Sequence, residues 1–566
     1  MSDISKLDQS ISFLETQSMD KDTAQTMLDR LEGVRSYLMS FIQNGQVTDK
    51  ASEENDSVLT SSLTSSLTSS LTSLVEGEID AIIKNVQNIP KSITPKIIED
   101  TSTHLSIKAH TMYPNIGMNQ QKLKALVTIE APIYQEAKRV PIDLVIVVDR
   151  SISMTGAPIE LVLKTLEFIV TQLSSNDRLA IVSYGTDVKR VVNLTKMDHV
   201  GKQIVNSLIP TIKINGNTNL CGGLVEGVEI LRERDLNDRA DVSSVLLLTD
   251  GEANQGYQTV SDIMRACINE NFSKFLPSSP NDDVELGCII NTFGFSENHN
   301  ATTLKQISEQ GRGMFYYIPT IDAIGNVFAD CLGGLLSTTS NNLKITLTPR
   351  LGVQLIKIYS KFAITSDEVG PGMIVNIPDM QSEERREILV DLLLDSVDKA
   401  GNYTVLGVQL GYTDVIQNVD RSSSMSIAIE RVGNFDSLDF DSVDLNVDRA
   451  NNREIAMSAI EEAQELSEKG DTETANVVIT SAIEAIGQSA SAGDNMCLTL
   501  VTELHTIKNE LSTRGYRSST QCAMRSITST HGYQRSGGTN TGDYITSTRK
   551  SMSNQCADYI SGKTIQ

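Results

Sequence analysis

The chain has 566 residues, enough for about two to four domains, and its formal net charge at pH 7 is −24. This acidity argues against nucleic acid and anionic membrane surfaces as main partners. No apolar run approaches the roughly eighteen residues of a membrane span, and the first residues do not resemble a signal peptide. The seven cysteines are scattered without a Cys-x-x-Cys pair, which indicates reduced thiols and predicts a cytoplasmic protein.

The first 98 residues differ in composition from the rest of the chain. Residues 1–45 carry apolar side chains at helical spacing, which predicts a helical segment that packs on its own chain. The alternative is a coiled coil that self-associates or binds a partner. Residues 46–98 are predicted to be a low-complexity Ser/Thr linker, partly helical, because they contain the repeat TSSLTSSLTSSLTSL.

Two groups of alternating apolar stretches flank the middle of the chain. Residues 99–139 contain two predicted strands, and residues 341–433 contain six more. Each group alone would leave half-buried strands with unpaired edges. We therefore expect the two groups to combine in one antiparallel β-sandwich, interrupted by the segment between them.

The most informative stretch is PIDLVIVVDRSISM, Pro141–Met154. Its first part is a short, β-branched and nearly unbroken apolar run, which is typical of a buried parallel strand. Asp149, Ser151 and Ser153 follow at alternate positions, in the pattern DxSxS. Open α/β sheets bind ligands in the loop after such a strand, and a carboxylate with two hydroxyls offers hard oxygen ligands for Mg²⁺ or Mn²⁺.

The DxSxS pattern occurs twice more, so it carries little weight alone. The copy that starts at Asp8 lies in a predicted helix. The copy that starts at Asp420 lies between two alternating apolar stretches, as a hairpin turn would. Only the copy at Asp149 follows a buried-type strand and precedes a predicted helix, so only this copy is expected to be functional.

Two further stretches extend the candidate site. Thr218 lies in a Gly/Asn turn, NGNTNL, and Asp250 ends a second buried-type strand in SSVLLLTDG. The ordered set DxSxS, GxTNL and TDG resembles the von Willebrand factor A (VWA) domain and its metal-ion-dependent adhesion site. The resemblance implies a doubly wound, Rossmann-like domain over residues 140–338 that binds one divalent cation, Mg²⁺ or Mn²⁺. The implied metal ligands are Asp149, Ser151, Ser153, Thr218 and Asp250. Ile152 stands where many members carry glycine.

The remaining regions are predicted from periodicity and composition. Helices and strands alternate through residues 140–338. Residues 446–513 have alanine-rich helical faces, which favour close packing and predict a helical bundle. Residues 514–566 are rich in serine and glycine, and they are predicted to be a polar, loosely held tail.

A narrower resemblance concerns the stretches around the VWA portion. TMYP, the helix with Arg449 and Arg453, GDNMCLTLVTEL, and HGYQR followed by DYIT are similar to cytosolic plant VWA proteins. Those proteins carry a RING finger and act as ubiquitin ligases. This sequence contains no Cys/His cluster of the kind that binds the zinc of a RING, so the resemblance does not imply ligase activity here.

The predicted fold is therefore α/β: a doubly wound VWA domain inserted in an antiparallel β-sandwich, with helical N- and C-terminal regions. The predicted function is non-enzymatic: the chain binds a protein partner with an exposed Asp or Glu through the cation. One alternative is a RING-less adaptor or subunit of a ubiquitin-ligase-type complex. Another is an oligomerising scaffold that self-associates through its terminal helices, with an idle metal site.

Overall fold

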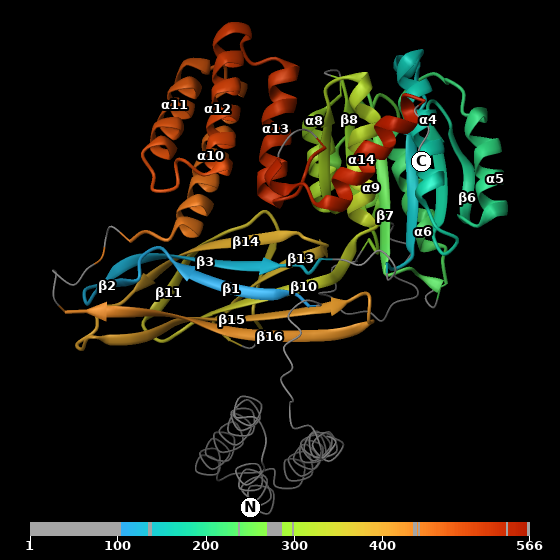
Figure 1. Cartoon of the computed structure of the whole chain (residues 1–566). Helices are drawn as coiled ribbons and strands as arrows, with labels where there is room; N and C mark the ends of the chain where they lie inside the picture. Colours follow the sequence, from blue (N-terminus) through green and yellow to red (C-terminus); the bar gives the residue numbers. More distant parts are fainter. Residues whose placement is uncertain are drawn as a thin grey trace, which may run out of the picture. The chain divides into compact units, whose positions relative to one another are not determined.

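The computed structural model describes most of the chain from residue 104 onward (Figure 1). The described residues are 104–133, 139–235, 238–268, 286–296, 299–368, 370–433, 439, 442–538 and 542–562. They belong to one compact unit, Glu99–Gln566. The helical segment predicted for residues 1–45 and the linker predicted for residues 46–98 lie outside the described residues.

A six-stranded sheet forms the centre of the region between residues 140 and 338. Its strands lie in the order β6-β5-β4-β7-β8-β9, and all neighbours are parallel except β5 and β6. All eight residues of the central strand β4 are buried, as its apolar sequence predicted. The bounds are β4 Ile142–Asp149, β5 Arg178–Tyr184, β6 Val188–Lys196, β7 Val242–Thr249, β8 Ile289–Phe295 and β9 Arg312–Ile318.

In the described part of this region, three helices cover each face of the sheet, which confirms the predicted doubly wound fold (Figure 1). The first face carries α4 (Ala157–Gln172), α5 (His199–Leu208) and α9 (Ile324–Leu335). The second face carries α6 (Leu220–Arg232), α7 (Val260–Ile268) and α8 (Ala301–Gln310). Helix α8 was not predicted, because its sequence ATTLKQISEQ is mostly polar and has few apolar residues to set a helical period.

Two antiparallel sheets enclose a second apolar core and form a β-sandwich. Strand β3 pairs with β14 along its whole length, from Gln121 opposite Leu394 to Glu130 opposite Arg385. Strands from before and after the α/β region therefore share one sheet, which confirms the predicted insertion. The first sheet contains β1 Ser106–Thr111, β3 Gln121–Glu130, β14 Arg385–Leu394 and β11 Val353–Tyr359. The second contains β12 Ala363–Ser366, β13 Met373–Gln381, β10 Thr338–Pro349, β15 Gly401–Asp414, β16 Val419–Val432 and β2 Asn115–Gly117.

The helical C-terminal region begins with α10 (Leu445–Glu468), α11 (Thr472–Gly487) and α12 (Asn495–Arg514). Alanines and aliphatic residues of these helices form a separate apolar core. All seven cysteines are free and buried, as the sequence predicted. In the described part of the chain, no helix is both long and apolar enough to cross a membrane.

The prediction of a loosely held tail from residue 514 is wrong. Two further helices, α13 (Ser518–Tyr533) and α14 (Ser547–Ile560), lie in this segment. Helix α14 packs on α9, and its Met552 and Cys556 belong to the core on the first face of the α/β sheet (Figure 1). The prediction failed because many polar side chains of this segment are buried and hydrogen-bonded, and a hydropathy pattern does not reveal such burial.

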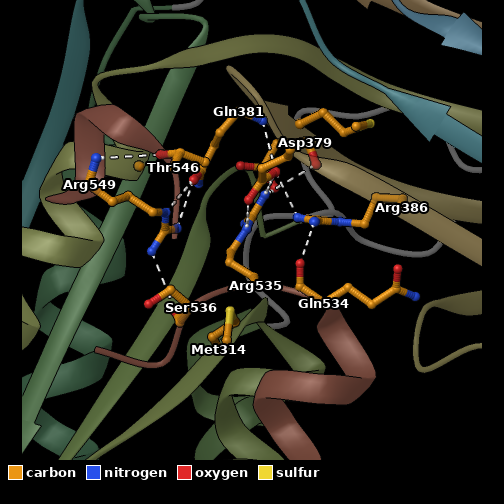
Figure 2. Close-up of polar contacts among 12 residues, drawn as sticks. Met314, Asp379, Gln381, Arg386, Gln534, Arg535, Ser536, Thr546 and Arg549 are labelled. Carbon is orange, nitrogen blue, oxygen red and sulfur yellow. Dashed lines mark hydrogen bonds and ion pairs between the residues drawn. The ribbon is translucent and has the colours of Figure 1, made fainter. Parts of the chain in front are cut away.

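One arginine of α14 joins the α/β region to the sandwich. Arg549 is 1% exposed, and its Nη1 donates to Asp330 Oδ2 of α9 at 2.5 Å. Its Nε and Nη2 donate to Gln381 Oε1 of β13, at 3.0 and 2.7 Å (Figure 2). The guanidinium therefore bridges two regions that have separate apolar cores.

A second arginine in the same segment adds a network of ion pairs with the sandwich. Arg535 donates to both carboxylate oxygens of Glu384, at 2.6 and 2.8 Å, and to Asp379 at 3.1 Å (Figure 2). Arg386 donates to Glu384 and to the backbone carbonyl of Gln534, both at 2.7 Å. Burial alone would raise the pKa of Glu384, but the adjacent arginines hold it well below its usual range, so this carboxylate stays charged.

We expect the substitution Arg535→Met to lower the free energy of unfolding at pH 7 by about 3–5 kcal/mol, because it removes the ion-pair partner of buried Asp379 and leaves Glu384 with Arg386 alone. Urea denaturation measures this loss. The matched control is Lys108→Met, which removes an exposed ion pair with Glu130 on β1 and β3. This control should cost less than about 1 kcal/mol. Equal losses in the two variants would contradict a special role for the buried network.

Candidate metal centre

Three loops meet at the carboxyl edge of the α/β sheet. The first loop, residues 150–156, leaves β4, and the third loop, residues 250–257, leaves the neighbouring strand β7. The second loop, residues 213–219, leads into α6. The chain winds in opposite directions from β4 to β5 and from β4 to β7, and such a switch point is where open α/β sheets bind ligands.

The carboxylate of Asp149 is buried and held on both sides. Its Oδ1 accepts a hydrogen bond from the backbone N–H of Ser151 at 2.8 Å, and its Oδ2 accepts one from Thr249 Oγ1 at 2.6 Å. Neither donor carries a positive charge. Burial therefore raises the pKa of Asp149 above its usual value, although the hydrogen bonds oppose this change.

The two serines connect this carboxylate to Asp250. The hydroxyls of Ser151 and Ser153 lie 3.0 Å apart, and Ser153 donates to Asp250 Oδ1 at 2.7 Å. Asp250 is 5% exposed. Burial, followed by repulsion from Asp149, raises the pKa of Asp250 to about 6. Among the described residues, no arginine or lysine forms an ion pair with either carboxylate.

Thr218 completes the candidate site from the second loop. Its backbone N–H donates to Asn254 Oδ1 at 2.8 Å, and its carbonyl accepts from the Asn254 N–H at 3.2 Å. A Cβ placed on Gly251 would lie 3.7 Å from Ser153 Oγ and 3.8 Å from Thr218 Oγ1. Both hydroxyls therefore border the same space above Gly251, and the structure brings all five predicted residues together.

This donor set fits a hard divalent cation. It consists of three neutral hydroxyls and two carboxylates, all of them oxygen donors. A cation would offset both the burial of the two carboxylates and their mutual repulsion. Within the described ranges, no group of three or more His, Cys, Asp or Glu side chains could hold a metal ion.

Sequence reasoning missed two residues that hold these loops. Thr249 donates to Asp149, which lies a hundred residues earlier; its place before Asp250 in TDG was the only signal. Arg150 is 7% exposed, and its guanidinium donates to Asp187 Oδ1 at 2.8 Å and to the carbonyl of Lys213 at 3.2 Å. Arg150 therefore fastens the first loop to the second, and its charge is paired with Asp187.

The other two copies of DxSxS do not resemble this site. The copy at Asp8 lies outside the described residues. The prediction that the copy at Asp420 lies in a hairpin turn is wrong. This copy lies within strand β16, and the turn lies at residues 415–418. Asp420, Ser422 and Ser424 are exposed on one side of that strand. The turn could not be placed correctly because RSSSMS lacks the apolar alternation of a strand.

Residues 143–330 match the family model of the von Willebrand factor type A domain. The chain contains a VWA domain. Residues 443–537, which include α10 to α13, match a second model, described as the N-terminal region of a CPSF6-like RSLD domain. A solved von Willebrand factor type A structure from Catenulispora acidiphila is similar in fold, with a TM-score of 0.58 at 14% identity. That likeness covers 76% of this chain and 98% of the other, so it extends beyond the VWA domain.

Two plant proteins are distantly related to this chain. The E3 ubiquitin-protein ligase WAV3 of Arabidopsis thaliana is 26% identical over 366 residues, which cover 63% of this chain and 44% of the ligase. The probable E3 ubiquitin-protein ligase WAVH2 of the same plant is 25% identical over 389 residues, which cover 67% and 48%. The chain thus spans about half the length of these relatives. Both similarities extend beyond the VWA domain.

The geometry predicts that Asp250 destabilises the cation-free protein. The pKa of Asp250 is about 6 in the folded chain and lower in the unfolded chain. Protonation of Asp250 therefore increases the free energy of unfolding as pH falls from about 6 to 4, and this contribution is lost as pH rises again. In EDTA at pH 7, Asp250→Asn should therefore raise the free energy of unfolding by about 1–2 kcal/mol. The same change at exposed Asp420 should have little effect. A less stable Asp250→Asn protein would contradict the assigned environment.

Proposed function

We propose that the VWA domain binds one Mg²⁺ or Mn²⁺ ion and, through it, a protein partner with an exposed Asp or Glu. VWA domains often hold a divalent cation at a metal-ion-dependent adhesion site. The observation that carries the proposal is the arrangement of Asp149 and Asp250. Two buried carboxylates lie beside three hydroxyls at the ligand-binding edge of the sheet. Among the described residues, no arginine or lysine forms an ion pair with either carboxylate.

Each residue would have a distinct role toward the cation. Ser151, Ser153 and Thr218 would ligate it through neutral hydroxyl oxygens, while Asp149 and Asp250 would act through coordinated water. Because few charges touch the metal directly, it keeps a net positive field toward solvent. An anionic oxygen of a partner, Asp or Glu, is the ligand that such an ion favours in its open position.

The proposed role is non-enzymatic and cytoplasmic. The site supplies a binding position for a carboxylate, and we assign no bond-making or bond-breaking step to it. Thr249, at the end of β7, and Arg150, in the first loop, would keep the ligands in place through the hydrogen bonds described above.

A second candidate is an adaptor or subunit of a ubiquitin-ligase-type complex. The similarity to WAV3 covers 366 residues, far more than the VWA domain alone, and therefore includes regions outside it. The two candidates are compatible, because an adaptor also needs a surface that captures a partner. A RING-containing protein that co-purifies with the full chain would favour the adaptor role.

Calorimetric titration of the full chain with Mg²⁺ and with Mn²⁺ tests the metal site. We expect the substitutions Asp149→Ala and Thr218→Ala to weaken binding at least about tenfold, because each removes a group from the coordination shell or its water network. The matched control Asp420→Ala alters the same residue type in the same motif on β16 and should leave the affinity unchanged. Equal affinities for the Asp149 variant and the control would remove the assignment.

A further inference from the structure

Two large apolar side chains are exposed on the loops that carry the candidate ligands. Ile152 is 66% exposed and lies between Ser151 and Ser153. Tyr257 is 59% exposed and lies at the end of the third loop, after Asp250. Exposed apolar groups beside a polar binding site mark surfaces where partners dock.

The backbone of Ile152 is fixed without help from its side chain. Its N–H donates to the carbonyl of Gly216 at 3.1 Å, and its carbonyl accepts from the N–H of Thr155 at 3.1 Å and from the Thr155 hydroxyl at 2.6 Å. The exposed part of the side chain therefore contributes little to the stability of the loop. It places an apolar group directly next to two of the proposed ligands.

The residues before Tyr257 fix the end of the third loop. Gln255 donates to the carbonyl of Thr186 at 2.9 Å, which fastens the third loop to the one after β5. Gly256 has a positive φ of 77°, and a Cβ there would lie 2.7 Å from Asn219 Oδ1, so only glycine allows this close approach to the start of α6. The tight turn leaves Tyr257 exposed to solvent.

The charges near the site limit how many acidic residues a partner can place beside the cation. Glu252, two residues after Asp250, is exposed, and the whole chain carries a net charge of −24. One partner carboxylate would be neutralised by the cation. Additional acidic residues beside it would face Glu252 and the net negative charge of the chain.

We propose that the partner presents a single Asp or Glu flanked by apolar residues, which pack on Ile152 and Tyr257, and not a cluster of acidic residues. This inference rests on the proposed function and specifies the partner for the same site. The contact of one carboxylate with Mg²⁺ is weak, so the surrounding surface must add affinity. An exposed tyrosine is well suited to this, because aromatic residues are enriched among the residues that dominate binding energy.

Three capped pentapeptides test the inference on the full chain: Gly-Leu-Asp-Leu-Gly, Gly-Gly-Asp-Gly-Gly and Gly-Asp-Asp-Asp-Gly. Each is immobilised, and its affinity for the chain is measured by interferometry in Mn²⁺ and in EDTA. In Mn²⁺ we expect the leucine peptide to bind about tenfold more tightly than the other two, from apolar area removed from water. Ile152→Ala and Tyr257→Ala should each reduce this preference. The control Val419→Ala, an exposed aliphatic residue on β16, should keep it.

The outcomes separate the inference from the function on which it rests. If all three peptides bind equally and only in Mn²⁺, the apolar contact is refuted while the carboxylate site stands. The same holds if the triple-aspartate peptide binds most tightly, or if the preference survives in the Ile152→Ala/Tyr257→Ala double variant. If no peptide binds differently in Mn²⁺ and EDTA, the proposed function itself fails, and the inference fails with it.

Discussion

Buried arginine–carboxylate pairs join regions whose main apolar cores are separate. The VWA sheet, the β-sandwich and the first helices of the C-terminal region each bury their own apolar residues. Arg549 contacts the VWA domain and the sandwich together, and Arg535 fastens the same segment to Glu384. Desolvating these charges is costly, so the network adds less net stability than its contacts suggest. The network mainly fixes how the regions are arranged, because the buried charges are paired in this one arrangement.

This arrangement separates the candidate metal centre from the sandwich. The chain enters the VWA domain at the start of β4 and leaves it after α9, into β10 of the sandwich. Asn341 of β10 donates to the carbonyl of Asp241, which lies just before β7. The sandwich therefore adjoins the amino edge of the sheet, whereas Asp149 and Asp250 lie at its carboxyl edge. The connections of the VWA domain thus place the candidate metal centre away from the sandwich.

The sequence predicted those features that depend on apolar periodicity or on a local motif. The buried run before Asp149 predicted both the central strand and the site, since a strand end and its loop are adjacent in sequence. Thr249 and Arg150 escaped because their partners become neighbours only after folding. Helices α13 and α14 were missed for a related reason: Arg549 of α14 is polar in sequence but 1% exposed, because its partners come from α9 and β13. Similarly, Asp420 was placed in a turn because β16 exposes polar side chains there.

The central claim is that a divalent cation binds among the hydroxyls of Ser151, Ser153 and Thr218. A crystal structure of the full chain soaked in Mn²⁺, with data collected for anomalous scattering, tests it most directly. The account predicts an anomalous peak at about 2.0–2.3 Å from these three oxygens, with water between the ion and the two carboxylates. Ser153 can keep its hydrogen bond to Asp250, because a hydroxyl ligates through a lone pair and retains its proton. A peak elsewhere, or no peak at the site, would contradict the account.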